Sequence, residues 1–344
     1  MFRAMPLAEF EIFEPSDFRL RPLIGDFPNV QYTKTPIASA SSVGKHLSFG
    51  WGGQNLDASG FDVFERFNLP VVTARGAVNI LTTHDVRGVS SGLVDIKGFF
   101  RKQYTRYSMS RADKVITVSE TMKAEIERNF ANADVSVVYN GVDASLYKSI
   151  SSEELSAFRR KYCLPDGYIL AVGHLEARKN ILHLINAVSL LRGRGLDVPL
   201  VVIGNDSGQG RLVSELIEKK SLGGSVRVLS GLTDLDVRCA YGLSSLLVFP
   251  SRYEGFGIPI LEAMAASCPM VLSDIPVFRE ITQNQGLYFD CNDVEAIAHS
   301  IETGLHSTVR RKELVSYGDA RVSDFGFDRL AAQLAVLYDQ ALQN

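Results

Sequence analysis

From Tyr168 onward, short apolar runs alternate with stretches of helical periodicity, and this alternation constrains the fold more than any other feature of the chain. The runs cover residues 168–172, 199–203, 226–230, 246–249, 269–273 and 287–289. They are apolar throughout, which is typical of parallel strands buried on both faces. Helices are predicted between them, at 179–193, 210–221, 234–243, 259–266 and 293–303. Repeated strand–helix–strand units of this kind predict a doubly wound α/β sheet.

The first 145 residues are also α/β, but with fewer strands and longer loops. Strands are predicted at 10–13, 30–33, 78–85, 114–119 and 135–140, and helices at 97–111 and 120–130. The turn-rich segment 140–152 is the best domain boundary, because a helix N-cap follows it at Ser151 or Ser152. We therefore expect domains at 1–147 and 148–325, and a C-terminal helix within 326–344 that docks through one apolar stripe.

Composition excludes several classes of protein. A length of 344 residues suits two domains, and a net charge of −3 gives no attraction to nucleic acid. The four cysteines have no C-x-x-C spacing, which argues against a zinc site and a disulfide framework and fits a reducing compartment. No apolar run approaches the length of about 18 residues that a membrane span needs, and residues 1–18 lack a signal-peptide core. The sequence thus predicts a cytoplasmic protein that does not bind nucleic acid.

Familiar phosphate-binding patterns are absent from the sequence, and its one metal-like pattern has another explanation. It contains no G-x-x-x-x-G-K-[ST] and no G-x-G-x-x-G after a strand, which disfavours P-loop and NAD-type chemistry. The triplet 234–236 (DLD) resembles a metal-binding D-x-D, but Thr233 or Asp234 is also well placed to cap the next helix. The capping explanation is favoured, and no metal is expected.

The stretch 249–262, FPSRYEGFGIPILE, is the most informative. A strand ends here, a glycine-containing loop with Glu254 follows, and a helix begins near Pro259. Two carboxylates, Glu254 in the loop and Glu262 in the helix, can accept hydrogen bonds from neighbouring hydroxyls, as polyol recognition requires. For one glutamate alone, a solvated loop or helix-end position is the simpler explanation. The whole constellation favours a polyol site.

A second informative stretch, VGHLEARKN at 172–180, follows the first strand of the same domain and carries two cations. Arg178 and Lys179 stand where the next helix begins, and both side chains suit phosphate oxygens. Alone, the pair would be a solvated surface patch. Because strand ends of a parallel sheet share one edge, the pair together with Glu254 and Glu262 favours a site for a diphosphate and a sugar.

These motifs, GHLEARKN, the E-x7-E spacing within PSRYEGFGIPILEAMA, and YNGVD at 139–143, resemble those of the retaining, nucleotide-sugar-dependent glycosyltransferases of family 4, also called group 1. The resemblance covers about residues 60–325. It implies the GT-B fold, in which two Rossmann-like domains face a cleft. Residues 1–147 would form the acceptor side, 148–325 would bind the nucleotide sugar, and the helix in 326–344 would pack back across the cleft.

The resemblance also assigns roles to matching residues. Arg178 and Lys179 would bind the donor diphosphate, where Gly173 allows a close approach. His84, in TTHD, matches a histidine near the reacting sugar, with a structural role at a strand end as the alternative. A VSE motif at 118–120 matches one on the cleft wall, although Ser119 is equally suited to cap a helix.

In the E-x7-E segment, the resemblance places Glu254 near the donor sugar hydroxyls. The backbone amides of Gly255, Phe256 and Gly257 would lie beside it, and Glu262 would bind the ribose hydroxyls of the nucleotide.

The implied reaction is retaining transfer of a hexose to a glycan or lipid-linked acceptor, as in surface or secreted polysaccharide synthesis. The diphosphate leaves with its charge neutralised, so neither a metal nor another cofactor is required. GDP-mannose is the first candidate donor and a UDP-sugar the second. A catalytically silent partner of another transferase and a GT-B nucleotide-sugar epimerase are the alternatives.

Two further expectations concern the first domain. Segment 97–114 carries six Lys or Arg residues and several aromatic residues, and would contact an anionic membrane surface or form a basic solvated helix face. Family members normally begin with a strand followed by a glycine-rich loop. The chain starts beyond such a unit on this interpretation, so a shortened first domain, with impaired activity, is expected.

Overall fold

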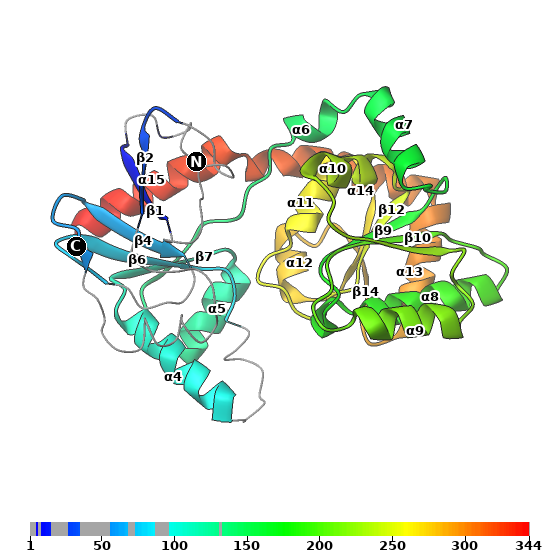
Figure 1. Cartoon of the computed structure of the whole chain (residues 1–344), viewed down its shortest axis with the longest axis horizontal. Coiled ribbons are helices and arrows are strands. Elements are labelled where there is room, and N and C mark those ends of the chain that lie inside the picture. Colours follow the sequence, from blue (N-terminus) through cyan, green and yellow to red (C-terminus); the bar gives the residue numbers. More distant parts are fainter. Residues whose placement is uncertain are drawn as a thin grey trace. The chain divides into compact units, whose positions relative to one another are not determined.

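The computed structural model describes residues 5, 8–14, 27–34, 56–67, 73–86, 96–130 and 133–343. The chain divides into two compact units (Figure 1). The first consists of Met1–Tyr139 together with Phe327–Asn344, and the second of Asn140–Gly326. The first unit thus ends before the predicted boundary at residue 147, and the C-terminal helix belongs to it.

The second unit is built on a six-stranded parallel sheet with the order β11-β10-β9-β12-β13-β14. Its strands are β9 (Ile169–Val172), β10 (Leu200–Ile203), β11 (Val226–Leu229), β12 (Leu246–Phe249), β13 (Met270–Ser273) and β14 (Leu287–Phe289). All six strands expected from the apolar runs are present, and the doubly wound arrangement is confirmed. The strand order reverses direction between β9 and β12, which lie side by side at the centre of the sheet.

Helices cover both faces of this sheet (Figure 1). On one face lie α8 (Ile181–Gly193), α9 (Gly210–Lys219) and α13 (Val294–His306). On the other lie α10 (Asp234–Leu243), α11 (Ile258–Ala265), α12 (Pro276–Ile281) and α14 (Thr308–Arg321). Two further helices, α6 (Ser145–Lys148) and α7 (Ser152–Lys161), precede the first strand, and Ser151 caps α7 through a capping box as expected. Helices α12 and α14 were not predicted.

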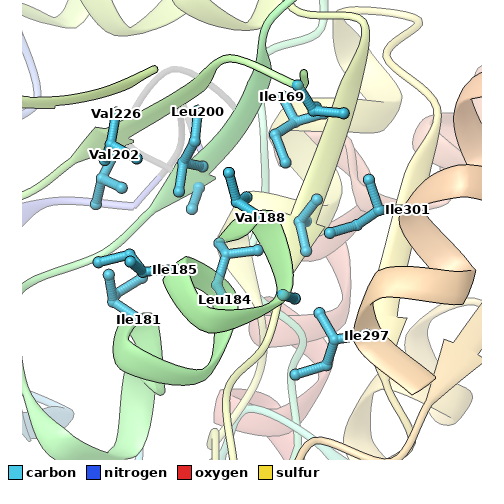
Figure 2. Close-up of a cluster of buried hydrophobic side chains, with 14 of the residues drawn as sticks. Ile169, Ile181, Leu184, Ile185, Val188, Leu200, Val202, Val226, Ile297 and Ile301 are labelled. Carbon is cyan, nitrogen blue, oxygen red and sulfur yellow. The ribbon is translucent and has the colours of Figure 1, made fainter. Parts of the chain in front are cut away.

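A large hydrophobic core of the second unit lies between the sheet and the helices α8 and α13 (Figure 2). From α8, Leu184, Ile185 and Val188 point toward the strands and are fully buried. From α13, Ile297 and Ile301 complete the layer. Each such side chain contributes roughly 1.5–3 kcal/mol on burial, so this layer fixes where the carboxyl ends of the strands lie.

The first unit contains a four-stranded parallel sheet with the order β4-β6-β7-β8. Its strands are β4 (Val63–Phe67), β6 (Val78–Thr83), β7 (Lys114–Thr117) and β8 (Val135–Val137). Two parallel pairs accompany it: β1 (Phe10–Glu14) with β2 (Val30–Lys34), and β3 (Leu56–Asp57) with β5 (Ala74–Arg75). Strands β3, β4 and β5 were not predicted.

Neighbouring residues of β6 face opposite sides of this sheet. Leu81 packs in a cluster with residues of α4 (Ile96–Ser110) and α5 (Glu120–Asn129). Ile80 packs instead with Leu334 of α15 (Phe327–Gln343). The C-terminal helix therefore supplies the second layer over the first unit's sheet, which explains the apolar stripe in its sequence.

The expectation that the chain starts beyond the usual first strand and glycine-rich loop stays a prediction. Two segments of the first unit bear on it, at 15–26 and 35–55. Both lie outside the described residues.

Candidate functional site

The predicted phosphate-binding residues lie at the point where the sheet of the second unit reverses its strand order. Arg178 and Lys179 stand in the 3-10 turn η2 (Ala177–Lys179) that follows β9. Glu254 lies in the loop that follows β12, the strand next to β9. In doubly wound sheets, ligands bind outside the carboxyl ends of the strands at this reversal.

The structure brings these three side chains into direct contact. The Nη1 atom of Arg178 lies 2.5 Å from Oε2 of Glu254, and Nζ of Lys179 lies 2.7 Å from Oε1 of the same carboxylate. A second carboxylate, Glu176, lies 2.7 Å from Nη2 of Arg178. The side chains of Lys179 and Glu254 are only 11% and 10% exposed, so the solvated-patch explanation is wrong.

Burial and charge act against each other on Arg178. Burial favours the neutral form, but the Glu254 and Glu176 carboxylates outweigh that effect and raise the pKa of Arg178 above its usual value. The guanidinium therefore stays charged, and both of its Nη atoms are paired with carboxylates.

The position of Lys179 depends on Gly173. Gly173 has a φ of +147°, and a Cβ atom there would lie 2.8 Å from Cε of Lys179. The Nζ atom lies 5.1 Å from the centre of the Phe249 ring on β12. Glycine leaves room for the lysine stem in this position, and the φ of Gly173 disfavours a side chain, so Gly173 determines where Lys179 lies.

Arg252 stabilises the η2 turn through two hydrogen bonds. Its backbone N–H donates to the carbonyl of Arg178 at 2.8 Å. Its guanidinium donates to the carbonyl of Ala177 at 3.4 Å. A pocket of about 440 Å³ between α8 and α9 reaches the same turn at Ala177 and Asn180.

The loop of the E-x7-E segment leads directly into α11. Gly257 is the N-cap with a φ of +142°, and Pro259 lies in the first turn, as the sequence predicted. Phe256 is buried and meets Phe325 edge to face at 6.1 Å, which anchors the loop, while Gly255 between it and Glu254 is half-buried. The helix N-terminus adds partial positive charge at this edge of the sheet.

Glu262 lies inside α11 and has partners of its own. Its Oε2 accepts a hydrogen bond from Tyr241 at 2.7 Å, and its Oε1 accepts one from Tyr147 at 3.1 Å. Burial raises the pKa of Glu262, while the two tyrosine hydrogen bonds oppose that rise. The two glutamates of the motif therefore belong to different local networks, Glu254 with the cations and Glu262 with two phenols.

His84 belongs to the first unit, where it follows β6 directly. Although the residue as a whole is exposed, partial desolvation of its ring lowers the pKa of His84, and the charge of Asp85 opposes this shift only in part. The neutral imidazole is therefore favoured at pH 7. In the same unit, Oγ of Ser119 accepts from the N–H of Met122 at 3.1 Å, so the capping role of this serine is confirmed.

The D-x-D triplet acts as a helix start. Thr233 caps α10, and Asp236 completes a capping box with it. Asp236 also pairs with Lys161 at 3.2 Å. Across the part of the chain that the structure describes, no group of three His, Cys, Asp or Glu residues is placed to hold a metal ion.

The basic segment 97–114 forms most of α4 and the start of β7. Lys102, Arg106 and Arg111 are exposed, and Phe99 and Tyr107 are 56% and 51% exposed beside them. Lys114 differs, since it is buried and pairs with Asp134 at 2.8 Å. Within the described ranges, no helix combines the length and apolar character needed to cross a bilayer.

Sequence reasoning did not assign a role to four residues at this site: Glu176, Tyr147, Tyr241 and Arg252. Glu176 lies within the motif GHLEARKN, so its charge beside Arg178 was a usable signal. The two tyrosines lie 115 and 21 positions before Glu262 in the chain, and no local pattern connects them to it.

Two family descriptions match successive parts of the chain. Residues 158–321 match "Glycosyl transferases group 1", and residues 53–146 match "Glycosyltransferase Family 4". Together they include His84, Arg178, Lys179, Glu254 and Glu262, whereas Tyr147 lies between the two matched ranges.

Curated relatives are similar over about two thirds of the chain. The O-antigen chain mannosyltransferase B of Escherichia coli is 33% identical over 234 residues, which is 67% of this chain and 61% of that protein. The O-antigen chain mannosyltransferase RfbU of Salmonella typhimurium is 28% identical over 257 residues, 73% of this chain and 66% of that protein. The chain thus matches less than two thirds of the length of each.

Solved structures share the fold at low sequence identity. A glycosyltransferase from Rickettsia africae has a TM-score of 0.72 at 18% identity, covering 98% of this chain and 99% of that one. HepE from Anabaena, in complex with UDP and glucose, has a TM-score of 0.73 at 16% identity, covering 97% and 100%. Sucrose-phosphate synthase from Thermosynechococcus elongatus has a TM-score of 0.76 at 19% identity, covering 96% and 88%. The architecture is therefore that of the GT-B glycosyltransferases.

Proposed function

Because the chain belongs to the family 4 (group 1) glycosyltransferases, we propose that it transfers a hexose from a nucleoside-diphosphate sugar to a glycan or lipid-linked acceptor. The single observation that carries the proposal is the cluster of Arg178, Lys179 and Glu254 at the strand-order reversal of the second unit. Two cations held by one carboxylate are prepared to exchange that carboxylate for phosphate oxygens.

In the proposed reaction, the bond between the anomeric carbon and the diphosphate oxygen breaks as the acceptor oxygen attacks from the same face. The acceptor proton passes to the departing diphosphate. Arg178 and Lys179 neutralise the charge that grows on the leaving group, and such preorganised cations supply much of the rate in transfers of this type. Glu254 holds both cations in place in the free protein; once the diphosphate has replaced it there, its carboxylate accepts from donor sugar hydroxyls, while His84 acts near the reacting sugar. The configuration at the anomeric carbon is retained.

For the donor, GDP-mannose is the first choice and a UDP-hexose the second. Two curated relatives are named mannosyltransferases of the O-antigen chain, which supports mannose and a surface polysaccharide. HepE was solved with UDP and with UDP-glucose, which supports a nucleoside-diphosphate donor and keeps UDP open. We propose that neither a metal nor a cofactor takes part.

Arginine 178 gives the decisive test. With GDP-mannose as donor, we expect ligand stabilisation and nucleoside diphosphate release for the unchanged chain. Arg178→Ala should lower the release rate by about 10²–10³-fold, because one cation that stabilises the leaving group is lost. A panel of GDP- and UDP-sugars, read by thermal shift and by product release, identifies the base; a ligand at 100 Kd adds about 2.7 kcal/mol.

The matched control is Arg211→Ala, which removes an 89%-exposed arginine from α9 and should leave the rate unchanged. A rate for Arg178→Ala equal to that of the unchanged chain would refute the proposed role. Stabilisation by nucleotide sugars without any release in the presence of acceptors would favour a silent partner protein, and sugar isomerisation without release would favour an epimerase.

We further propose that the exposed face of α4 contacts an anionic membrane surface, where a lipid-linked acceptor would lie. Exposed cations beside exposed aromatic side chains support this placement. In flotation with anionic vesicles, the charge reversals Lys102→Glu and Arg106→Glu together should weaken binding on the order of ten-fold or more. Lys219→Glu with Lys220→Glu reverses two exposed charges on the second unit and should not. Flotation that is insensitive to salt and to the α4 variant would contradict the membrane proposal.

A further inference from the structure

Glu262 is held on two sides by phenol hydroxyls from different helices. Tyr241 comes from α10 and Tyr147 from α6, and their rings meet edge to face with centroids 6.2 Å apart. Helix α6 packs against both α10 and α11. Tyr147 and Glu262 are thus 115 positions apart in the sequence but in direct contact, and both belong to the second unit.

Both phenols act as donors to the carboxylate. Burial raises the pKa of Tyr147 and of Tyr241 far above the usual value, and the Glu262 charge raises both further. The hydroxyls therefore keep their protons, and each gives one hydrogen bond to a different carboxylate oxygen. Asp234 and Arg238 of α10 are the other charged groups that act on Tyr147.

The arrangement leaves Glu262 able to accept two more hydrogen bonds. An ionised carboxylate has about four lone-pair positions, two on each oxygen. Tyr147 and Tyr241 take one position on each oxygen, which fixes the carboxylate plane, and among the described residues no other side-chain or backbone donor bonds to this carboxylate. A fixed carboxylate with one open position on each oxygen is complementary to two neighbouring hydroxyls, such as the 2′- and 3′-hydroxyls of a ribose.

We propose that Tyr147 is a positioning residue that orients Glu262, together with Tyr241, so that the site selects ribonucleotides over 2′-deoxyribonucleotides. This inference rests on the proposed function, in which Glu262 accepts from the donor ribose. Tyr147 itself does not touch the ligand in this account. Its loss should therefore affect the part of the binding energy that depends on the ribose hydroxyls and spare the part that depends on the diphosphate.

The test compares the Kd values of GDP and 2′-deoxy-GDP, and of UDP and 2′-deoxy-UDP, for the full chain. The unchanged chain should prefer the ribonucleotide by about ten-fold or more, since a hydrogen bond to a charged group gives at least that factor. Tyr147→Phe removes one hydroxyl and should reduce this preference several-fold, with the Kd of the 2′-deoxynucleotide unchanged. Tyr317→Phe is the matched control, because it removes a hydroxyl that donates to Gln283 at 3.2 Å in the same unit, and its preference should equal that of the unchanged chain.

Several results would overturn the inference. An unchanged preference in Tyr147→Phe would show that Tyr147 does not position Glu262. If Tyr147→Phe loses affinity equally for the ribonucleotide and the 2′-deoxyribonucleotide, the role of Tyr147 is merely structural. An unchanged chain that binds GDP or UDP without preferring ribose would refute the inference and leave the proposed transfer intact, whereas failure to bind any nucleoside diphosphate would refute the proposed function as well. Should Tyr147→Phe fold poorly, Glu262→Gln provides the second variant, and a preference that persists in it likewise overturns the inference.

Discussion

Replacing Glu254 with alanine is expected to lower the rate of sugar transfer by about 10²–10³-fold and also to destabilise the free protein. The carboxylate contacts Arg178 and Lys179 at 2.5 and 2.7 Å, with the lysine only 11% exposed. Its removal leaves two cations close together, of which only Arg178 keeps a carboxylate, Glu176. An uncompensated, largely buried charge costs about 3–5 kcal/mol, and the displaced cations should no longer meet the leaving group correctly.

A bound diphosphate should restore most of the lost stability, because its oxygens replace the missing carboxylate. The measurement is the free energy of unfolding with and without GDP or UDP, beside the rate of transfer. Glu254→Ala should gain more stability from the nucleotide than the unchanged chain does. Glu295→Ala, which removes an exposed partner of Arg194, is the control and should change stability by less than about 1 kcal/mol. An equal nucleotide effect in both chains would contradict the idea that phosphate replaces Glu254.

The sheet of the second unit could be predicted because its signal is local. Each of its strands is a short apolar run between stretches of helical periodicity, and tertiary packing reinforces the same assignment. Helices α12 and α14 were missed because their local signal is weak. Helix α12 has only six residues, and α14 is mostly polar, so it has too few apolar positions to reveal a helical period. The short strands β3 and β5 in the first unit have two residues each, too few for any period.

The candidate site divides in the same way. The pairing of Arg178 and Lys179 with Glu254 could be anticipated, because β9 and β12 end at one edge of a parallel sheet and the motif residues follow directly. The partners of Glu262 could not, because Tyr147 reaches it from a four-residue helix near the start of the second unit. Such a contact follows from the packing of α6 on α10 and α11, which no spacing rule in the sequence encodes.

Glycine 204 connects the stability of the second unit to its proposed phosphate site, and Gly204→Ala should destabilise that unit strongly. A Cβ atom at this position would lie 2.1 Å from the carbonyl oxygen of Gly173, a backbone atom that cannot rotate away. The two strand ends are tied together, since the N–H of Gly173 donates to the carbonyl of Ile203 at 2.8 Å. They must separate to admit the methyl group, and we expect a loss of about 3 kcal/mol or more in the free energy of unfolding.

The same displacement should reach the ligand. Gly173 lies against the stem of Lys179, so a shift of Gly173 moves the cation that is proposed to face the diphosphate. At a temperature where Gly204→Ala remains folded, GDP and UDP should therefore stabilise it less than they stabilise the unchanged chain. Gly223→Ala is the matched control, because no atom lies within 4 Å of a Cβ placed there, and both stability and nucleotide effect should stay unchanged. If Gly204→Ala unfolds at the same denaturant concentration as Gly223→Ala, the close approach of the two strand ends does not constrain this position. If it is destabilised but keeps the full nucleotide effect, Gly173 does not determine where Lys179 lies.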